Sequence, residues 1–318
     1  MRSALFALPL FTSLFAAATA YAYPDKPVRV IVAFTPGGVT DIIARTLMPK
    51  LGEIWKQPVV VENRPGAGGS LAAQVVSRSS GDGYTLLVHS SGYAINAALM
   101  PALPYDRKDL VDVAPLASQA QVLVVNPASG IKSVGELIAA ARAKPGQVTY
   151  GSAGIGSGAH FNAEKFRIAA GIDLLHVPYK GGADAINDTV AGRLVFTFNT
   201  ITLALPYIRD GRLAVLGVSS TRRSALLPDV PTIAESGLPG FEFTFWNGLW
   251  APAATPAAIT DQIARDLAQI VHTPDVRQRL SRLGAEPMTM TPKEFSRFVE
   301  SEIETDQRIV RASGIRAQ

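Results

Sequence analysis

The recurrence of a short apolar strand, a glycine-rich turn and a helix is the feature that most constrains how this chain can fold. The β-branched run 28–34 ends at Thr35-Pro36-Gly37-Gly38, and helical spacing of apolar residues begins at Thr40. The pattern repeats with a strand at 58–62, a glycine turn at 63–69 and a helix at 70–78. Short buried strands that alternate with helices predict βαβ crossovers, and therefore an α/β fold with mainly parallel sheets flanked by helices on both faces.

The order of these units predicts two lobes. Three strands come first, five strand and helix units follow from about residue 121, and the chain ends in one strand at 245–251 and three helical segments. Such an order indicates that the chain leaves a first lobe, builds a second and returns. We predict lobe I over 23–118 and 220–318 and lobe II over 119–219, and we expect the crossings at 115–125 and 213–220 to act as a hinge.

The first 22 residues read as a secretion signal peptide. Arg2 supplies a basic start, 4–20 is almost wholly apolar, and Ala20-Tyr21-Ala22 offers the small residues at which a signal peptidase cuts. Removing these 22 of the 318 residues leaves 296, enough for two lobes of ordinary size. No later apolar stretch is long enough to span a bilayer, so we expect a soluble protein exported to the periplasm.

The composition excludes several classes of function. The chain has no cysteine, which rules out disulfides, thiolate catalysis and cysteine metal sites. Without Arg2 it keeps 29 Lys and Arg against 26 Asp and Glu, with no long basic run. A nucleic-acid partner would require a basic stripe, so this mild balance fits a small anion better.

Glycine clusters stand where the predicted strands end. They include Gly37 and Gly38, the turn 66–69, Ser90-Ser91-Gly92 and the loop 151–158. In such sheets ligands bind at the carboxyl ends of strands, where helix N-termini present free N–H groups. A single glycine turn serves a tight bend equally well, but four on the same edges favour an anion-binding site.

Enzymatic alternatives find weaker support. Gly154, Gly156 and Ala159 match a dinucleotide fingerprint, but the next strand carries Asp173 at its start instead of an acid at its end. The chain shows no nucleophile elbow, P-loop or zinc-protease motif. His160 and Glu164 are spaced to share a metal, although two ligands do not make a site. We therefore predict no catalytic residue, cofactor or metal, and keep a secreted hydrolase or isomerase of a small carboxylate as the alternative.

Six motifs occur together and in order along the chain: Tyr23-Pro24-Asp25-Lys26-Pro27, Pro36-Gly37-Gly38-Val39-Thr40-Asp41, Glu62-Asn63-Arg64-Pro65-Gly66-Ala67-Gly68-Gly69, Asp82-Gly83-Tyr84-Thr85-Leu86, Val177-Pro178-Tyr179-Lys180-Gly181 and Leu227-Pro228-Asp229-Val230-Pro231-Thr232. With them, the sequence resembles the Bug, or TctC-like, extracytoplasmic solute receptors of tripartite tricarboxylate transporters. The resemblance implies a type II-like periplasmic binding protein whose hinged lobes close on one small carboxylate and deliver it to membrane permease subunits. A sensor that signals to a membrane partner is a further alternative, and the need for free hinge motion favours a monomer.

The resemblance also implies which residues hold the ligand. The two gripping loops contribute Gly37, Gly38 and Thr40, with Asp41 bracing the turn, and Ser152, Gly156, Ser157 and His160 opposite. Further candidates from lobe II are Gly181, Ala183 and Asn199. The end of the third strand adds His89, Ser90 and Ser91, with a structural role for His89 equally open.

Two side-chain features bear on the identity of the ligand. Phe34, Tyr93 and Trp246 can either sandwich a flat ring or pack in the core. Many relatives read Phe-Asp-Asn where this chain reads Phe198-Asn199-Thr200, so a neutral amide replaces a carboxylate. We therefore expect a ligand without an amino group: an aliphatic dicarboxylate, a tricarboxylate or an aromatic carboxylate.

Overall fold

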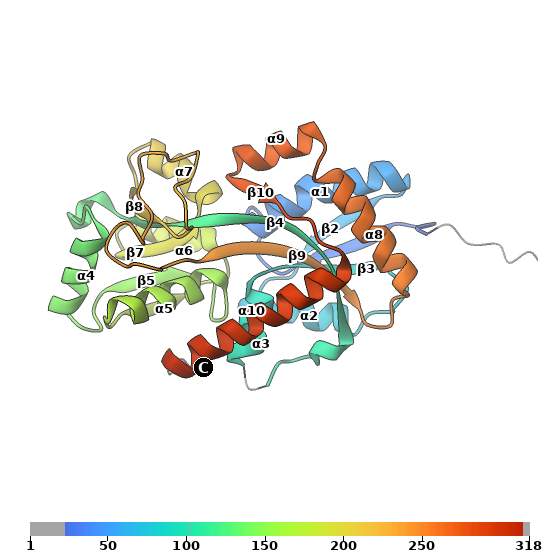
Figure 1. Ribbon diagram of the computed structural model, residues 1–318, viewed down its shortest axis with the longest axis horizontal. Coiled ribbons are helices and arrows are strands. Elements are labelled where there is room, and N and C mark those ends of the chain that lie inside the picture. Colours follow the sequence, from blue (N-terminus) through green and yellow to red (C-terminus); the bar gives the residue numbers. More distant parts are fainter. Residues whose placement is uncertain (1–22, 101, 314–318) are drawn as a thin grey trace, which may run out of the picture.

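The computed structural model describes residues 23–100 and 102–313 and shows two lobes side by side (Figure 1). The signal peptide expected over 1–22 lies outside these residues. Across the two described ranges, no helix combines the length and apolar character that a membrane crossing requires.

Lobe I is built on three parallel strands, β1 (Val28–Val32), β2 (Val59–Asn63) and β3 (Thr85–Ser90), in the order β2-β1-β3. One face of this sheet packs on α1 (Val39–Trp55), α8 (Ala257–Ile270) and α9 (Pro274–Arg282). The other face packs on α2 (Ser70–Ser77), α3 (Gly92–Leu99) and α10 (Pro292–Ser313). The apolar residues of the central strand β1 are fully buried, whereas its Arg29 is exposed and the edge strand β2 is only partly buried.

Lobe II repeats this plan with β5 (Thr149–Ser152), β6 (Leu175–Pro178) and β7 (Phe196–Thr200), parallel and in the order β6-β5-β7. Its helices α4 (Val134–Ala143) and α5 (Gly158–Ala170) cover one face. The opposite face carries α6 (Gly182–Val190) and α7 (Ile201–Arg209). The predicted fold class, two α/β lobes of the periplasmic binding protein type, is thereby confirmed.

Two long strands run side by side between the lobes, β4 (Leu110–Val125) and β9 (Thr244–Pro252) (Figure 1). The first part of β4, Leu110–Ala120, pairs antiparallel with β9, and its last part pairs with β7 and with β8 (Ala214–Val218). A short strand, β10 (Ala285–Pro287), also pairs with β4. Antiparallel crossing strands thus join two otherwise parallel sheets into one continuous ladder.

The structure differs from the sequence-based expectation at two elements. β4 begins at Leu110, whereas the sequence indicated a strand only from about residue 121. Residues that disfavour strands, such as Pro115, argue against a strand in this part of the sequence. The strand accommodates Pro115 because the pairing shifts register there. The short helix α3 was not expected, because a segment buried on nearly every side shows no periodic pattern.

The lobe limits stay a prediction. The segment between β8 and β9 packs on the core of lobe II through Ile233 and Phe241 before the chain enters the first sheet. Phe243 then donates its backbone N–H to the carbonyl of Ser219, which ties the two crossing segments together. We propose that the chain returns to lobe I at β9.

Candidate functional site

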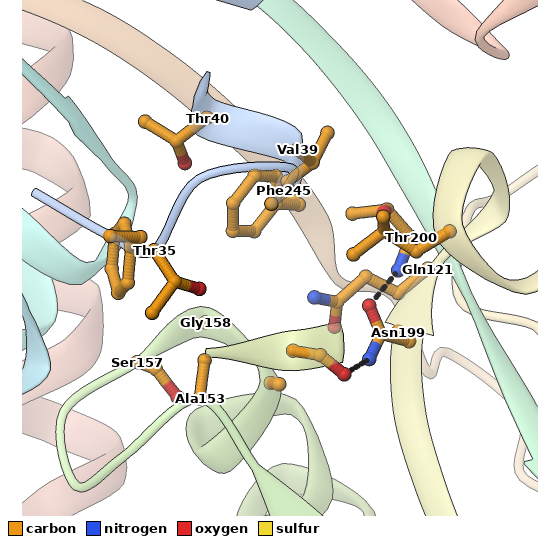
Figure 2. A pocket seen from close by; sticks show the side chains of 15 residues that line it. Thr35, Val39, Thr40, Gln121, Ala153, Ser157, Gly158, Asn199, Thr200 and Phe245 are labelled. Atoms are coloured by element: carbon orange, nitrogen blue, oxygen red, sulfur yellow. Dashed lines mark hydrogen bonds between the residues drawn. The ribbon is translucent and has the colours of Figure 1, made fainter. Parts of the chain in front are cut away.

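A pocket lies between the lobes, beside the crossing strands (Figure 2). All three parts of the molecule contribute to its wall. Lobe I supplies Phe34, Thr35, Gly38, Val39 and Thr40; the crossing strands supply Gln121 and Phe245; lobe II supplies Ala153, Ser157, Gly158, Ala159, Gly182, Asn199, Thr200 and Leu203. None of these lining residues carries a formal charge.

Four helices begin at this pocket. α1 follows Gly38, α5 follows Ser157, α6 starts at Gly182, and α7 follows Thr200. The N–H groups in the first turn of a helix have no intrahelical partner, and the helix dipole adds a partial positive charge of roughly half a unit there. Four such ends around a wall without charged side chains produce a site that favours an anion.

The turn of lobe I is held by Asp41, which is buried. Its carboxylate accepts hydrogen bonds from the Gly37 N–H, from Arg45 Nε and from Asn63 Nδ2, each at 2.9 Å. Burial opposes ionisation, but these hydrogen bonds outweigh it and lower the pKa of Asp41 below its ordinary value. An ionised Asp41 thus braces the turn that presents Gly38 and Thr40, and it does not itself line the pocket.

The glycine loop of lobe II is held by two stacked histidines. The rings of His160 and His176 lie 4.2 Å apart, and His160 Nδ1 accepts the Gly156 N–H at 3.3 Å. His176 Nε2 lies 2.7 Å from the hydroxyl of Ser152, at the start of the same loop. Burial lowers the pKa of His160 to about 4 and that of His176 to about 3, assisted by the charge of Arg167 and by His160 respectively. Both rings are therefore neutral near pH 7, as acceptance of the Gly156 hydrogen bond requires.

Glu164 does not join His160 in a metal pair. Its carboxylate accepts hydrogen bonds from the Tyr150 hydroxyl at 2.6 Å and from Arg167 Nε at 2.7 Å. The bond from Tyr150, which lies on β5, anchors α5 behind the loop.

Three glycines contact the opposite lobe closely, and we call these contacts the glycine seam: Gly68 against Ile155, Gly156 against Asn96, and Gly181 against Thr35. A Cβ atom on any of these glycines would lie closer to an atom of the opposite lobe than real Cβ contacts permit. The opposing atom is the backbone oxygen of Ile155 at Gly68, whereas it is a side-chain oxygen at Gly156 and Gly181.

Asn199 connects two of the helix ends. Its Nδ2 donates to the carbonyl of Gly182 at 2.8 Å, and its Oδ1 accepts the Thr200 N–H at 3.0 Å (Figure 2). Both ends of the amide are engaged, so Asn199 fixes the start of α6 relative to the start of α7.

Of the residues predicted from the sequence, some line the pocket, namely Phe34, Gly38, Thr40, Ser157 and Asn199. Others lie directly behind or beside the lining, namely Gly37, Asp41, Ser152, Gly156, His160, Gly181 and Ala183. The end of β3 lies farther back: His89 packs under Gly69, Ser90 Oγ accepts the Gly92 N–H, and Ser91 faces Gly158 at the lobe contact.

Trp246 and Tyr93 are placed in the core of lobe I. Trp246 donates from Nε1 to Glu302 Oε2 at 2.9 Å and packs edge-on against Phe298. Tyr93 packs against Trp250, with ring centroids 4.4 Å apart. Neither lines the pocket, because strand alternation turns Phe245, the neighbour of Trp246, toward it.

Gln121, Thr200 and Phe245 line the pocket without having been singled out in the sequence. A weak signal existed for two of them, since Gln121 is the polar start of an apolar run and Thr200 follows Asn199. For Phe245, an aromatic-rich strand gives no indication of which face looks toward a ligand.

Comparison with known proteins places the chain among receptors. A family profile described as the tripartite tricarboxylate transporter family receptor (TctC) matches residues 43–315. The protein BugT of Bordetella pertussis is 37% identical over 295 residues, which cover 92% of this chain and 90% of BugT.

Two solved structures share the whole fold. Rpa4515 of R. palustris, solved with adipate, superposes with a TM-score of 0.89 at 32% identity and covers 92% of this chain and 99% of its own. MatC from Rhodopseudomonas palustris, with bound malate, has a TM-score of 0.86 at 31% identity and covers 91% of this chain and all (100%) of its own. The matched proteins are solute receptors and not enzymes, as the sequence predicted. The chain belongs to the receptor family of the tripartite tricarboxylate transporters.

Proposed function

We propose that this protein captures one small carboxylate anion in the pocket between its lobes. The anion docks on the N–H groups at the start of α1, and closure brings the starts of α5, α6 and α7 onto it. Charge-assisted hydrogen bonds contribute about 1.5 to 3 kcal/mol each. Three or four of them support micromolar affinity after the ordering costs of several kcal/mol are subtracted.

The observation that carries the proposal is the convergence of four helix N-termini on a pocket without charged side chains. Such a wall stabilises negative charge without a bound counter-ion, and it offers no carboxylate to an ammonium group. Asn199 adds to this, because its amide is committed to Gly182 and Thr200. We therefore propose a ligand without an amino group.

The wall also favours a ligand whose body is apolar. The pocket wall includes the apolar side chains of Phe34, Val39, Leu203 and Phe245. The adipate of the R. palustris structure has such a body, whereas the malate of MatC carries a hydroxyl group. We propose that adipate-like and aromatic carboxylates bind more tightly here than hydroxylated ones.

A thermal-shift screen tests this function. The purified protein is heated with adipate, succinate, malate, citrate, benzoate, aspartate and glutamate, and hits are titrated by calorimetry. At a hundred times Kd, a ligand that binds only the folded state adds about 2.7 kcal/mol, which raises Tm by about 5 to 10 °C. If no carboxylate raises Tm, or if glutamate or aspartate binds most tightly, the proposed ligand class is wrong.

For the cellular context we propose periplasmic delivery of the ligand to the permease subunits of a tripartite tricarboxylate transporter. The signal-like residues 1–22 and membership of the receptor family support this. Deletion of the gene should abolish uptake of the radiolabelled ligand at micromolar concentration, and uptake that continues unchanged would contradict it.

A further inference from the structure

Two polar side chains meet on the hinge-side wall of the pocket, one from each of two paired strands. Gln121 of β4 and Thr200 of β7 are direct partners in the antiparallel register. Side chains opposite each other in such a pair lie about 5 Å apart at their Cβ atoms. Gln121 is 2% exposed and Thr200 is 1% exposed, and both line the pocket.

The carboxamide of Gln121 is held with its nitrogen toward the pocket. Its Oε1 accepts a hydrogen bond from Asn162 Nδ2, on α5, at 2.8 Å. Figure 2 shows the amide end of Gln121 pointing into the middle of the pocket. The backbone of Gln121 is fixed as well, because its N–H donates to Ser219 Oγ and its carbonyl accepts the Ser219 N–H.

The hydroxyl of Thr200 has no hydrogen-bond partner among the described residues, although it is buried. A buried hydroxyl left without a partner costs about 1 to 3 kcal/mol, so a ligand oxygen that accepts from it would recover this free energy. The same pocket is also lined by the apolar side chains of Val39, Leu203 and Phe245. A donor in such surroundings acts more strongly than it does in water.

We propose that Gln121 Nε2 and the Thr200 hydroxyl together bind one oxygen of the ligand carboxylate, and thereby fix its orientation and exclude cationic groups from this end of the pocket. This inference rests on the proposed carboxylate-binding function and adds the side-chain determinants to it. Gln121 lies on the strand that runs through both lobes. The pair therefore contacts the ligand from the hinge side of the pocket, whereas the helix N-termini contact it from the two lobes.

The test uses two nearly isosteric substitutions in the full mature chain. Gln121→Glu keeps an oxygen for Asn162 and replaces the donor by a negatively charged acceptor, and Thr200→Val removes only the hydroxyl. Calorimetry with adipate, malate and benzoate gives Kd for the wild type, both variants and the double variant. Gln121→Glu should weaken the best of these ligands at least about 100-fold and Thr200→Val about 10-fold, as loss of a charge-assisted bond predicts. The losses should be less than additive in the double variant, because both groups bind the same oxygen.

Gln119→Glu is the matched control, since Gln119 lies on the same strand, is also buried, and accepts a hydrogen bond from Thr202 outside the pocket. Its Kd should stay within about twofold of the wild type, and unliganded Tm values check the folding of every variant. If the wild type binds a carboxylate and Gln121→Glu binds it equally well, this inference alone is wrong. If the wild type binds none of the carboxylates of the thermal-shift screen, the proposed function fails and this inference fails with it.

Discussion

The two sides of the interface between the lobes are built in opposite ways. On the hinge side, β4 and β9 are paired antiparallel from Leu110 to Ala120, with two shifts of register. On the seam side, Gly68, Gly156 and Gly181 bring the lobes together by the close approach of bare backbone. Paired strands can twist and stay paired when the lobes rotate, whereas the contacts at the seam are lost when the lobes separate. We propose from this difference that the molecule opens at the seam and pivots on the strands, with the pocket between them.

Among the following variants, Gly68→Ala should reduce the affinity for the ligand most, because it prevents the lobes from meeting at the seam. The new methyl group would press on the carbonyl of Ile155 in the opposite lobe. Overpacking costs about 1 to 3 kcal/mol, and a closed form that is populated less lowers the apparent affinity in proportion. We expect Kd for the ligand found in the screen to rise by up to about 100-fold in calorimetric titration, although Gly68 does not line the pocket.

Gly171→Ala provides a matched control. Gly68 has φ +61 and Gly171 has φ +59, so both variants carry the same backbone strain, but a Cβ atom on Gly171 meets nothing within 4 Å. Both variants should lose similar stability without ligand, and only Gly68→Ala should lose affinity. Equal affinities in the two variants would show that the seam has no part in binding.

Asn199→Asp should have the next largest effect. The substitution removes the donor to Gly182 and introduces a negative charge at the pocket wall. We expect roughly a 30-fold loss of affinity for the anion. The control is Asn126→Asp, because Asn126 Nδ2 donates to Val190 at the far end of α6, away from the pocket. Similar losses in both variants would assign the effect to the helix and not to the site.

A smaller effect is expected for Gly181→Ala. Gly181 has an extended backbone with φ −160, which alanine adopts without strain, so the only penalty is the contact with Thr35 Oγ1. A side-chain atom can rotate away, and we expect about a 5- to 10-fold loss of affinity. The double variant Gly181→Ala with Thr35→Ala should bind more tightly than the two single losses predict. Strict additivity in this double-mutant cycle would contradict the contact.

The smallest expected effect is a change in the pH dependence of the free energy of unfolding, measured without ligand. The folded state lowers the pKa of His160 from an ordinary 6.5 to about 4, so the unfolded chain binds the proton first as the pH falls. This histidine therefore contributes stability that is present above pH 6.5 and is lost on acidification toward pH 4, by up to about 1.4 kcal/mol per pH unit. Asp306, whose pKa is raised to about 8 by burial and the nearby Glu302, acts in the opposite direction. The contribution of His160 is therefore measured by comparing the wild type with a variant that lacks this histidine.

His160→Gln should bind about one proton fewer on unfolding between pH 5 and 6 than the wild type. Urea unfolding at several pH values measures this difference as a change of slope. Identical slopes in the two proteins would mean that His160 is not held neutral behind the glycine loop.

The sequence allowed the fold and the site to be predicted to different degrees. β1, the turn at Gly37 and Gly38, and α1 were predictable because apolar period and turn chemistry agree there. The antiparallel course of β9 was not, since strand direction follows from how the lobes are joined and leaves no local signal.

At the candidate site, the glycine loops predicted the edges of the sheets where the pocket lies, but the positions of single residues depended on packing. Gly181 was predicted as a ligand contact and is placed at the seam, because only the position of Thr35 in the other lobe reveals why a side chain is excluded. Gln121 was not predicted as a site residue, because its partner Thr200 is distant in the sequence and is brought close only by the pairing of β4 with β7. Periodicity and motifs carry no information about which distant segments pair with each other.

The most direct test of the account measures the distance between the lobes with and without ligand. The chain has no cysteine, so spin labels can be attached through Leu71→Cys on α2 and Leu175→Cys on β6, two exposed positions on opposite lobes. Pulsed electron resonance should show a long, broad distance distribution without ligand that becomes short and narrow when the carboxylate binds, and Gly68→Ala should oppose this change. A distribution that stays the same while calorimetry records binding would contradict closure of the lobes on the ligand.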